Sequence, residues 1–289
     1  MRTVAFVGLG AMGLPMAKNL LAKQFHIRGF DTRQPAIDAL ANAGGTPCAS
    51  AADAATGADA LILMVVNAAQ AADVLDTALD PLAPAGTVIL MATCAPAGAA
   101  ALARRVQATG RRFIDAPVSG GIAGATGGTL TIMAAAPAES FAAAKPILDA
   151  LGDKLFHVGE QPGQGAAVKT VNQLLCGVHI AVAAEAFALA RKAGVDLDIL
   201  LQIMSGSAAA SWMLRDRGPR MLQADPPVAS AVDIFVKDLG LVLDAGRDAR
   251  AALPLAAAAH QLFLAASGRG DGTADDSQVI RSYQALNGA

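Results

Sequence analysis

The sequence of 289 residues has few charged residues, few aromatic residues and only three cysteines. Its formal net charge is −2 and it has no basic cluster, which argues against nucleic acid as the main partner. Cys48, Cys94 and Cys176 lie far apart and form no Cys-x-x-Cys pair, which favours reduced thiols over a disulfide framework or a zinc site. The four histidines are equally scattered, so the sequence predicts no metal centre.

Long runs of large apolar residues are also scarce. Hydrophobic residues make up 54% of the chain, but Ala provides much of this fraction, and we expect no membrane-spanning segment. The first eight residues predict a strand and a turn rather than a signal peptide. We therefore expect a soluble, cytoplasmic protein with no membrane partner and with enough length for two domains.

A glycine-rich turn lies between a predicted strand at residues 3–7 and a predicted helix at residues 14–23. Its glycines suit a tight turn, close approach of a pyrophosphate, and packing of the helix against the strand. The helix N-terminus would offer unpaired amides and a positive dipole end to the phosphates. The turn therefore predicts a dinucleotide site made by Gly8, Leu9, Gly10, Ala11, Met12 and Gly13.

The second predicted strand, at residues 26–30, ends in Asp31. A carboxylate at this position accepts hydrogen bonds from the ribose hydroxyls and repels a 2′-phosphate, so the sequence favours NAD over NADP. Arg33, two residues further on, would partly offset that repulsion and leaves some use of NADP open.

The α/β alternation continues through predicted strands at residues 60–66 and 87–91, each followed by a helix. Ligands of open parallel sheets gather beyond the carboxyl ends of the strands. For each residue at these strand ends, an ordinary role in a helix cap or a turn is an equal alternative to contact with the cofactor. The candidate cofactor-binding residues here are Val65, Val66, Asn67, Gln70 and Thr93.

A further predicted strand, at residues 112–115, leads into the sequence Ala-Pro-Val-Ser119-Gly120-Gly121. Proline and two glycines predict an exposed turn, in which the Ser119 hydroxyl and free amides can hold a carboxylate. A tight connection without function is the alternative interpretation. Two more strands, at residues 127–134 and 154–158, would complete the sheet and close a first domain at residues 1–160.

The chain from Gly163 to Gly194 predicts one long, apolar helix, with cationic residues in its last turn and a glycine after it. Lys169, Asn172 and Gln173 interrupt the apolar pattern and share one face. Because a helix this apolar should be mostly buried, the ammonium of Lys169 is expected to be either paired or functional.

The remaining residues predict helices only, at 197–205, 211–222, 235–252 and 255–267, with prolines as breaks at 219, 226–227 and 254. A helical domain at residues 161–289 cannot cover the long helix by itself, so we expect a homodimer or higher homo-oligomer. Asp233 and Lys237 lie four residues apart, a spacing that supports an ion pair within a helix.

Four motifs in order resemble the β-hydroxyacid dehydrogenase family, which includes 3-hydroxyisobutyrate dehydrogenase and tartronate semialdehyde reductase. They are Gly8-x-Gly10-x-x-Gly13, Asp115-Ala-Pro-Val-Ser-Gly-Gly121, Gly163-x-Gly165-x-x-x-Lys169-x-x-Asn172 and Lys237-Asp238. The resemblance spans nearly the whole chain. It implies an α/β fold, with an N-terminal Rossmann doubly wound parallel sheet, a long interdomain helix and an all-α C-terminal domain, in a homodimer or homotetramer.

The resemblance also assigns roles to residues. It implies that Lys169 is the catalytic lysine, that Ser119, Gly120, Gly121 and Asn172 line the substrate site, and that Thr93 and Lys237 contact the cofactor. Gln173, next to Asn172, is added to the candidate substrate-binding residues. A free lysine, with a pKa of about 10.4, is a poor base at neutral pH. Desolvation and a neighbouring cation, for which Lys237 is the candidate, would make it a better one.

One departure from the family pattern concerns substrate choice. The family commonly has Leu-Pro where this chain has Val65-Val66-Asn67, and this segment, together with residues 172–179, 211–213 and 230–238, resembles the L-threonate dehydrogenase branch. The resemblance implies NAD-dependent oxidation of L-threonate at its 2-hydroxyl. The alternatives are 3-hydroxyisobutyrate or tartronate semialdehyde as substrate, and a cofactor-binding scaffold without turnover.

Overall fold

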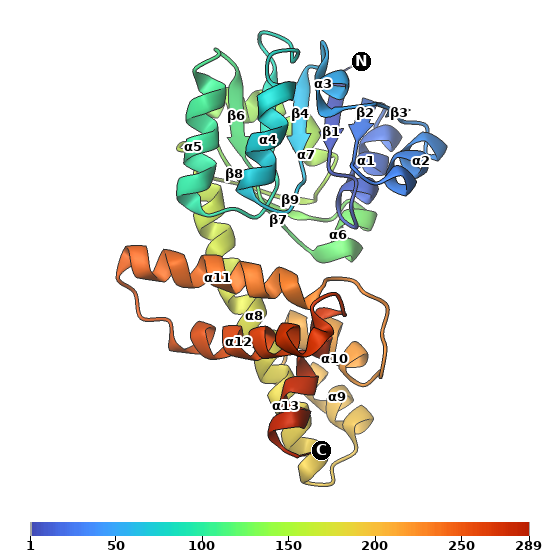
Figure 1. Cartoon of the computed structure of the whole chain (residues 1–289), viewed down its shortest axis with the longest axis vertical. Helices are drawn as coiled ribbons and strands as arrows, with labels where there is room; N and C mark the ends of the chain where they lie inside the picture. The colour runs from blue at the N-terminus through green and yellow to red at the C-terminus, as the bar shows by residue number, and fades with distance from the viewer. Residues whose placement is uncertain (1, 289) are drawn as a thin grey trace. The chain divides into compact units, whose positions relative to one another are not determined.

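A computed structural model describes residues 2–288 of the chain, which divide into two compact units between Lys169 and Thr170 (Figure 1). Each unit has its own hydrophobic core. The first unit contains every strand of the sheet, and the second is built from helices. This is the α/β Rossmann-type arrangement with an all-α C-terminal part that the sequence predicts.

The sheet has the strand order β3-β2-β1-β4-β5-β6-β8-β7, with β9 paired to β8. The strands from β1 to β6 are all parallel, as expected of a dinucleotide-binding fold. Their bounds are Thr3–Val7 for β1, His26–Phe30 for β2, Thr46–Pro47 for β3, Ala60–Leu63 for β4, Thr87–Leu90 for β5, Arg112–Asp115 for β6, Val118–Ser119 for β7, Thr131–Ala135 for β8 and Lys154–Gly159 for β9.

The far edge of the sheet departs from the predicted parallel pattern. β8 runs antiparallel to both β6 and β7, and β9 runs parallel to β8. The prediction of a strand from residue 127 is wrong at its start, because Gly127 ends the short helix α6, at Gly121–Gly127, and β8 begins only at Thr131. A short connection of this kind lets the chain reverse direction, whereas a parallel neighbour would need a long crossover.

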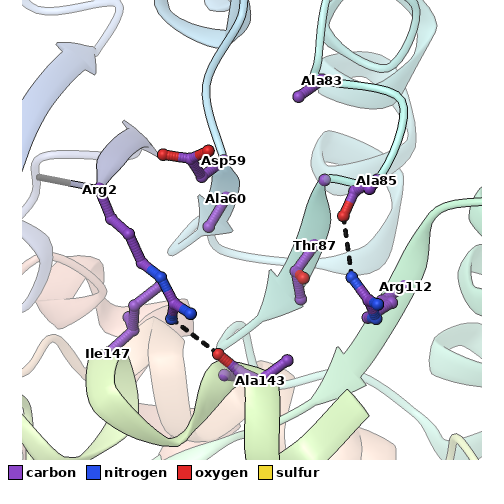
Figure 2. A pocket seen from close by; sticks show the side chains of 11 residues that line it. Arg2, Asp59, Ala60, Ala83, Ala85, Thr87, Arg112, Ala143 and Ile147 are labelled. Atoms are coloured by element: carbon purple, nitrogen blue, oxygen red, sulfur yellow. Dashed lines mark hydrogen bonds between the residues drawn. The ribbon is translucent and has the colours of Figure 1, made fainter. Parts of the chain in front are cut away.

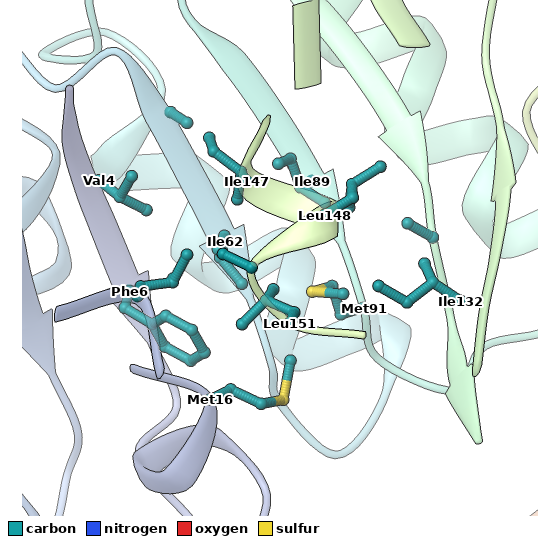
Figure 3. Close-up of a cluster of buried hydrophobic side chains, with 14 of the residues drawn as sticks. Val4, Phe6, Met16, Ile62, Ile89, Met91, Ile132, Ile147, Leu148 and Leu151 are labelled. Atoms are coloured by element: carbon teal, nitrogen blue, oxygen red, sulfur yellow. The ribbon is translucent and has the colours of Figure 1, made fainter. Parts of the chain in front are cut away.

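Helices cover both faces of the sheet, and each face has its own buried cluster. On one face α1, α2, α6 and α7 pack over residues such as Phe6, Ile62 and Ile89 (Figure 3), and on the other face α3, α4 and α5 pack over Leu61 and Val88. The helix bounds are Gly13–Ala22 for α1, Gln34–Asn42 for α2, Ala51–Ala55 for α3, Ala68–Ala78 for α4, Pro96–Gln107 for α5 and Ala138–Asp149 for α7. This two-sided cover explains why the parallel strands are apolar along their whole length.

The long helix α8 runs from Gln164 to Lys192, and Gly194 follows it with φ +73°. By length and composition alone it is apolar enough to cross a membrane, but half of its most apolar window is buried inside the protein. One helix of this kind is typical of the core of a soluble protein. The helices that follow are α9 at Leu197–Gly206, α10 at Trp212–Met221, α11 at Val232–Ala249, α12 at Pro254–Ala266 and α13 at Ile280–Leu286.

A buried ion network joins α10 to the segment before α13 within the second unit. The guanidinium of Arg217 lies 2.8 Å from Asp276, and that of Arg220 lies 3.0 Å from Asp275. Burial disfavours the Arg217 cation, but the nearby Asp276 and Asp216 carboxylates outweigh this and raise its pKa. The predicted break at Pro219 is wrong, because Pro219 lies inside α10 between the two arginines that these pairs hold in place.

Candidate functional site

The glycine-rich turn joins the carboxyl end of β1 to the start of α1. Gly8 has φ +95°, and a Cβ on it would lie 2.3 Å from the Met64 carbonyl oxygen, just after β4. A Cβ on Gly13 would lie 1.9 Å from the Gly8 carbonyl oxygen. The protein's own packing therefore demands glycine at both positions.

Gly10 is different, because the nearest atom to a Cβ there is the Nη2 of Arg33, at 3.6 Å. The space over Gly10 is thus left open on the side from which a pyrophosphate would approach, and the first amides of α1 follow directly. Of the other residues of the turn, Leu9 is buried, Met12 is half-buried and Ala11 is exposed. The residues present fit a dinucleotide phosphate.

Asp31 follows β2 and is held by its neighbours. Its carboxylate accepts hydrogen bonds from the backbone amide of Leu9 at 2.7 Å and from the amide and Nε of Arg33 at 2.9 and 3.0 Å. Burial raises the pKa of Asp31, but the bonds from Arg33 and Leu9 outweigh it, and the pKa is lowered overall. Asp31 therefore stays ionised and faces the turn, with Arg33 as its ion-pair partner.

We expect Asp31→Ser to shift cofactor use toward NADP. The substitution removes the charge that repels a 2′-phosphate and frees the Arg33 guanidinium. The ratio of kcat/KM for NADP to kcat/KM for NAD should therefore rise by roughly 10–100-fold. This corresponds to a few kcal/mol, the size of an interaction between two charges near a protein surface. Steady-state kinetics with both cofactors measures the ratio. The matched control is Arg33→Ala, which should move it the other way; an unchanged ratio in Asp31→Ser would contradict this assignment.

The candidate residues after β4 make an interlocking helix cap. The Asn67 side chain accepts from the amide of Gln70 at 2.9 Å, and the Gln70 side chain accepts from the amide of Val66 at 3.0 Å. The alternative cap role considered for these residues is therefore present, and the cap fixes the chain at the carboxyl end of β4 beside Gly8. Val65 is half-buried and Val66 is exposed, while Thr93, between β5 and α5, is half-buried.

The candidate carboxylate-binding turn follows β6. Ser119 ends β7, and Gly120 and Gly121 have φ of +129° and +59°, conformations that favour glycine. Ser119 pairs with Thr131 of β8, which fixes the base of the turn. All three residues are half-buried, so the turn is partly accessible to solvent.

Lys169, Asn172 and Gln173 lie on α8 at one-turn spacing, as predicted. Lys169 is buried. The amide nitrogen of Asn172 donates to the side-chain oxygen of Gln173 at 2.8 Å and lies 3.3 Å from the sulfur of Cys176. These polar groups are therefore ordered within an otherwise apolar helix.

Within the second unit, Asp238 links two of the candidate residues, and it was missing from the predicted site. Its carboxylate accepts a hydrogen bond from the Gln173 amide nitrogen and lies 2.8 Å from the Nζ of Lys237. Lys237 thus forms an ion pair with its neighbour Asp238. The signal in the sequence was a carboxylate on the apolar side of α11, where it is buried.

A cavity of about 190 Å³ lies elsewhere in the first unit (Figure 2). It is lined by Arg2, Asp59, Thr87 and Arg112, which precede or begin β1, β4, β5 and β6. It therefore opens at the amino ends of the strands, opposite the glycine-rich turn, and is not the predicted site. In residues 2–288, no group of three or more His, Cys, Asp or Glu side chains is placed to hold a metal ion.

Two models of known protein families match successive regions of the chain. Residues 3–159 match the family model for the NAD-binding domain of 6-phosphogluconate dehydrogenase, and residues 163–283 match the NAD-binding model of NADP-dependent 3-hydroxyisobutyrate dehydrogenase. The chain is 45% identical to an L-threonate dehydrogenase of Cupriavidus necator, over 99% of this chain and 97% of that protein.

Solved structures of related dehydrogenases have a similar fold over nearly the whole chain. A 3-hydroxyisobutyrate dehydrogenase from Salmonella typhimurium has a TM-score of 0.93 at 40% identity, covering 97% of this chain and 99% of that one. A 3-hydroxyisobutyrate dehydrogenase from Mycobacterium tuberculosis, solved with L-serine, has a TM-score of 0.84 at 30% identity, covering 98% of this chain and 99% of that one.

Fold and site define an NAD(P)-dependent dehydrogenase that oxidises hydroxy acids. The chain belongs to the β-hydroxyacid dehydrogenase family, related to 3-hydroxyisobutyrate dehydrogenase, and is similar to its L-threonate dehydrogenase branch.

Proposed function

We propose that the protein oxidises the 2-hydroxyl of L-threonate to the 2-oxo acid 2-dehydro-L-erythronate, with NAD as hydride acceptor, in the cytoplasm. The observation that carries the proposal is a buried lysine, Lys169, near the start of α8, in a chain that aligns over its full length with an L-threonate dehydrogenase. Full-length similarity supports the substrate, and the buried amine supports the chemistry.

Oxidation of a secondary alcohol removes a hydride from carbon and a proton from oxygen. The bound nicotinamide supplies the hydride acceptor. Lys169 takes the hydroxyl proton on its Nζ, and burial favours this role because it disfavours the charged ammonium. Asn172 and Gln173 orient the substrate, and Ser119 with the amides of Gly120 and Gly121 holds its carboxylate.

Lys237 contributes a cation that Asp238 fixes in place, and we assign it to the cofactor side of the site. Thr93, Val65, Val66, Asn67 and Gln70 border the cofactor along the carboxyl edge of the sheet. The cap of Asn67 and Gln70 supports this placement because it fixes that edge beside Gly8.

The second candidate substrate is 3-hydroxyisobutyrate, which the names of two similar solved structures favour. Tartronate semialdehyde remains the other small-acid alternative. A panel of L-threonate, its stereoisomers, 3-hydroxyisobutyrate, L-serine and glycerate, followed by NADH absorbance, tests the choice, with tartronate semialdehyde assayed in the reducing direction. L-threonate should give the highest kcat/KM. NAD binding without turnover of any of these acids would support the scaffold alternative instead.

We further propose that the protein is a homodimer or homotetramer. In the second unit, α8 carries exposed apolar side chains at seven-residue spacing, namely Leu175, Val182 and Leu189, and Leu189 is 71% exposed. Apolar residues repeated in this way are typical of a helix that packs against another helix.

Leu189→Glu is therefore expected to shift the protein to a smaller assembly, because a carboxylate in an apolar interface is costly to desolvate. Sedimentation velocity of wild type and variant measures the change. Phe156→Glu, at an exposed apolar residue on β9 in the first unit, is the control and should leave the sedimentation coefficient unchanged. A monomeric wild-type protein would refute the proposal.

A further inference from the structure

Asp115 is a buried carboxylate that the predicted site does not use. It ends β6, is 1% exposed, and accepts hydrogen bonds on one side-chain oxygen from the amides of Gly163 and Ala166, at 2.8 and 2.9 Å. Burial raises the pKa of Asp115, and the amides of Ala166, Gly163 and Gly165 oppose that shift. The three amides belong to the first turn of α8 and the residue before it.

This cap differs from the other side-chain caps of α-helices in the described part of the chain. Ser50, Asn67, Asp196 and Ser211 each accept an amide three residues ahead in their own helix. Asp115 lies about 50 residues before the helix that it caps. A local cap stabilises a helix end wherever that end lies, whereas this cap also fixes where α8 begins relative to the sheet.

The backbone at the same contact is packed without spare room. A Cβ on Gly165 would lie 2.5 Å from the Met133 carbonyl oxygen and 2.6 Å from that of Asp115. The start of α8 is therefore pressed against the end of β6 and the middle of β8, and Asp115 binds it there. The second glycine of the Gly163-x-Gly165 motif is explained by this close approach.

We propose that Asp115 is the positioning residue for Lys169. Ala166, which Asp115 binds, lies three residues before Lys169, so one helical turn separates the fixed amide from the lysine. In the other direction, Asp115 lies four residues before Ser119 at the candidate carboxylate-binding turn. One side chain thus sets the spacing between the proton acceptor and the turn that holds the substrate. This inference rests on the proposed function of Lys169.

The test compares three variants in kcat, in KM for NAD and in the pH profile of kcat. Asp115→Ala removes the acceptor, and Gly165→Ala pushes the first turn of α8 away from the strands. Both should lower kcat by roughly 10–100-fold, the effect expected of an error of about 1 Å in the position of a catalytic group. Both should change the acidic limb of the pH profile, where kcat falls as the proton acceptor Lys169 becomes protonated. Both should leave KM for NAD within about twofold of wild type, because the glycine-rich turn is untouched. Asp115→Asn keeps an acceptor oxygen and should recover most of the lost kcat.

Leu82→Ala is the control for general loss of stability. Leu82 is buried near the amino ends of the strands, beside Gly86. It should lower the melting temperature but leave kcat and its pH profile as in wild type. If Asp115→Ala does not fold, Gly165→Ala and Asp115→Asn still provide the test, because they act on the same contact by different routes.

Two results would overturn the inference. One is a kcat within twofold of wild type in Gly165→Ala or Asp115→Ala, and the other is an equal loss of kcat in Leu82→Ala. Lys169→Ala is assayed alongside. If that variant keeps its turnover, the proposed function is wrong and the inference falls with it. If only Lys169→Ala loses turnover, the proposed function stands and the inference alone is wrong.

Discussion

Lys169→Ala should reduce kcat for the preferred hydroxy acid by roughly 10²–10⁴-fold, the range that a general acid–base contributes. The substitution removes the amine that we assign to the hydroxyl proton, and it leaves the glycine-rich turn, Asp31 and the turn at Ser119 intact. KM for NAD should therefore stay within about twofold of wild type, since loss of a group that acts only in the transition state lowers kcat and kcat/KM together.

A lysine at the far end of the same helix provides the matched control. Lys192 lies in the last turn of α8 and is exposed, so Lys192→Ala should have wild-type kinetics. Lys169→Met is a second variant, because it fills most of the same volume without an amine and separates loss of chemistry from loss of packing. Turnover in Lys169→Met close to that of wild type would rule out the amine as the proton acceptor.

The Rossmann sheet could be predicted because its central strands are short apolar runs buried on both faces, each followed by polar or turn residues. The glycine-rich turn at Gly8 could be predicted for a further reason. The backbone comes so close to other backbone there that only glycine fits, and a required glycine can be recognised in the sequence. The long helix α8 was visible through its apolar run and the glycine after Lys192.

Other elements give weak signals. β3 has two residues and α3 has five, so neither shows a period, and α7 contains Pro146, which suggests a break. The antiparallel direction of β8 depends on how the chain returns after α6, and apolar runs do not encode strand direction. These features depend on tertiary packing rather than on local pattern.

The site shows the same division. The sequence could single out a residue where its type points to one role. Glycines before a helix and a lysine in an apolar helix are examples. The use of Asp115 and Asp238 could not be predicted, although both residues stand in the family motifs, because a carboxylate is common and its role depends on which distant groups it meets. Asp115 meets amides about 50 residues away, and Asp238 meets an amide 65 residues away.

Gly8 and Gly10, two of the three glycines in the glycine-rich turn, should respond differently to the same substitution. In Gly8→Ala the new methyl group meets the Met64 carbonyl oxygen at 2.3 Å in a backbone with φ +95°, so the protein should lose at least about 3 kcal/mol of unfolding free energy, with strain and the clash both contributing. In Gly10→Ala the nearest protein atom is 3.6 Å away, at ordinary contact distance, so the unfolding free energy should change by less than about 1 kcal/mol.

Gly10→Ala should weaken NAD binding even though it has little effect on stability. A methyl group on Gly10 occupies the space that the pyrophosphate needs, so Gly10→Ala, although folded, should bind NAD at least about 10-fold more weakly, a loss of about 1.4 kcal/mol. Chemical denaturation measures the first effect, and titration calorimetry with NAD measures the second on folded protein. Gly10→Ala with wild-type affinity would mean that the phosphates do not pass over this turn. Gly8 would then be required by the fold alone, which its contact with Met64 already explains without any ligand.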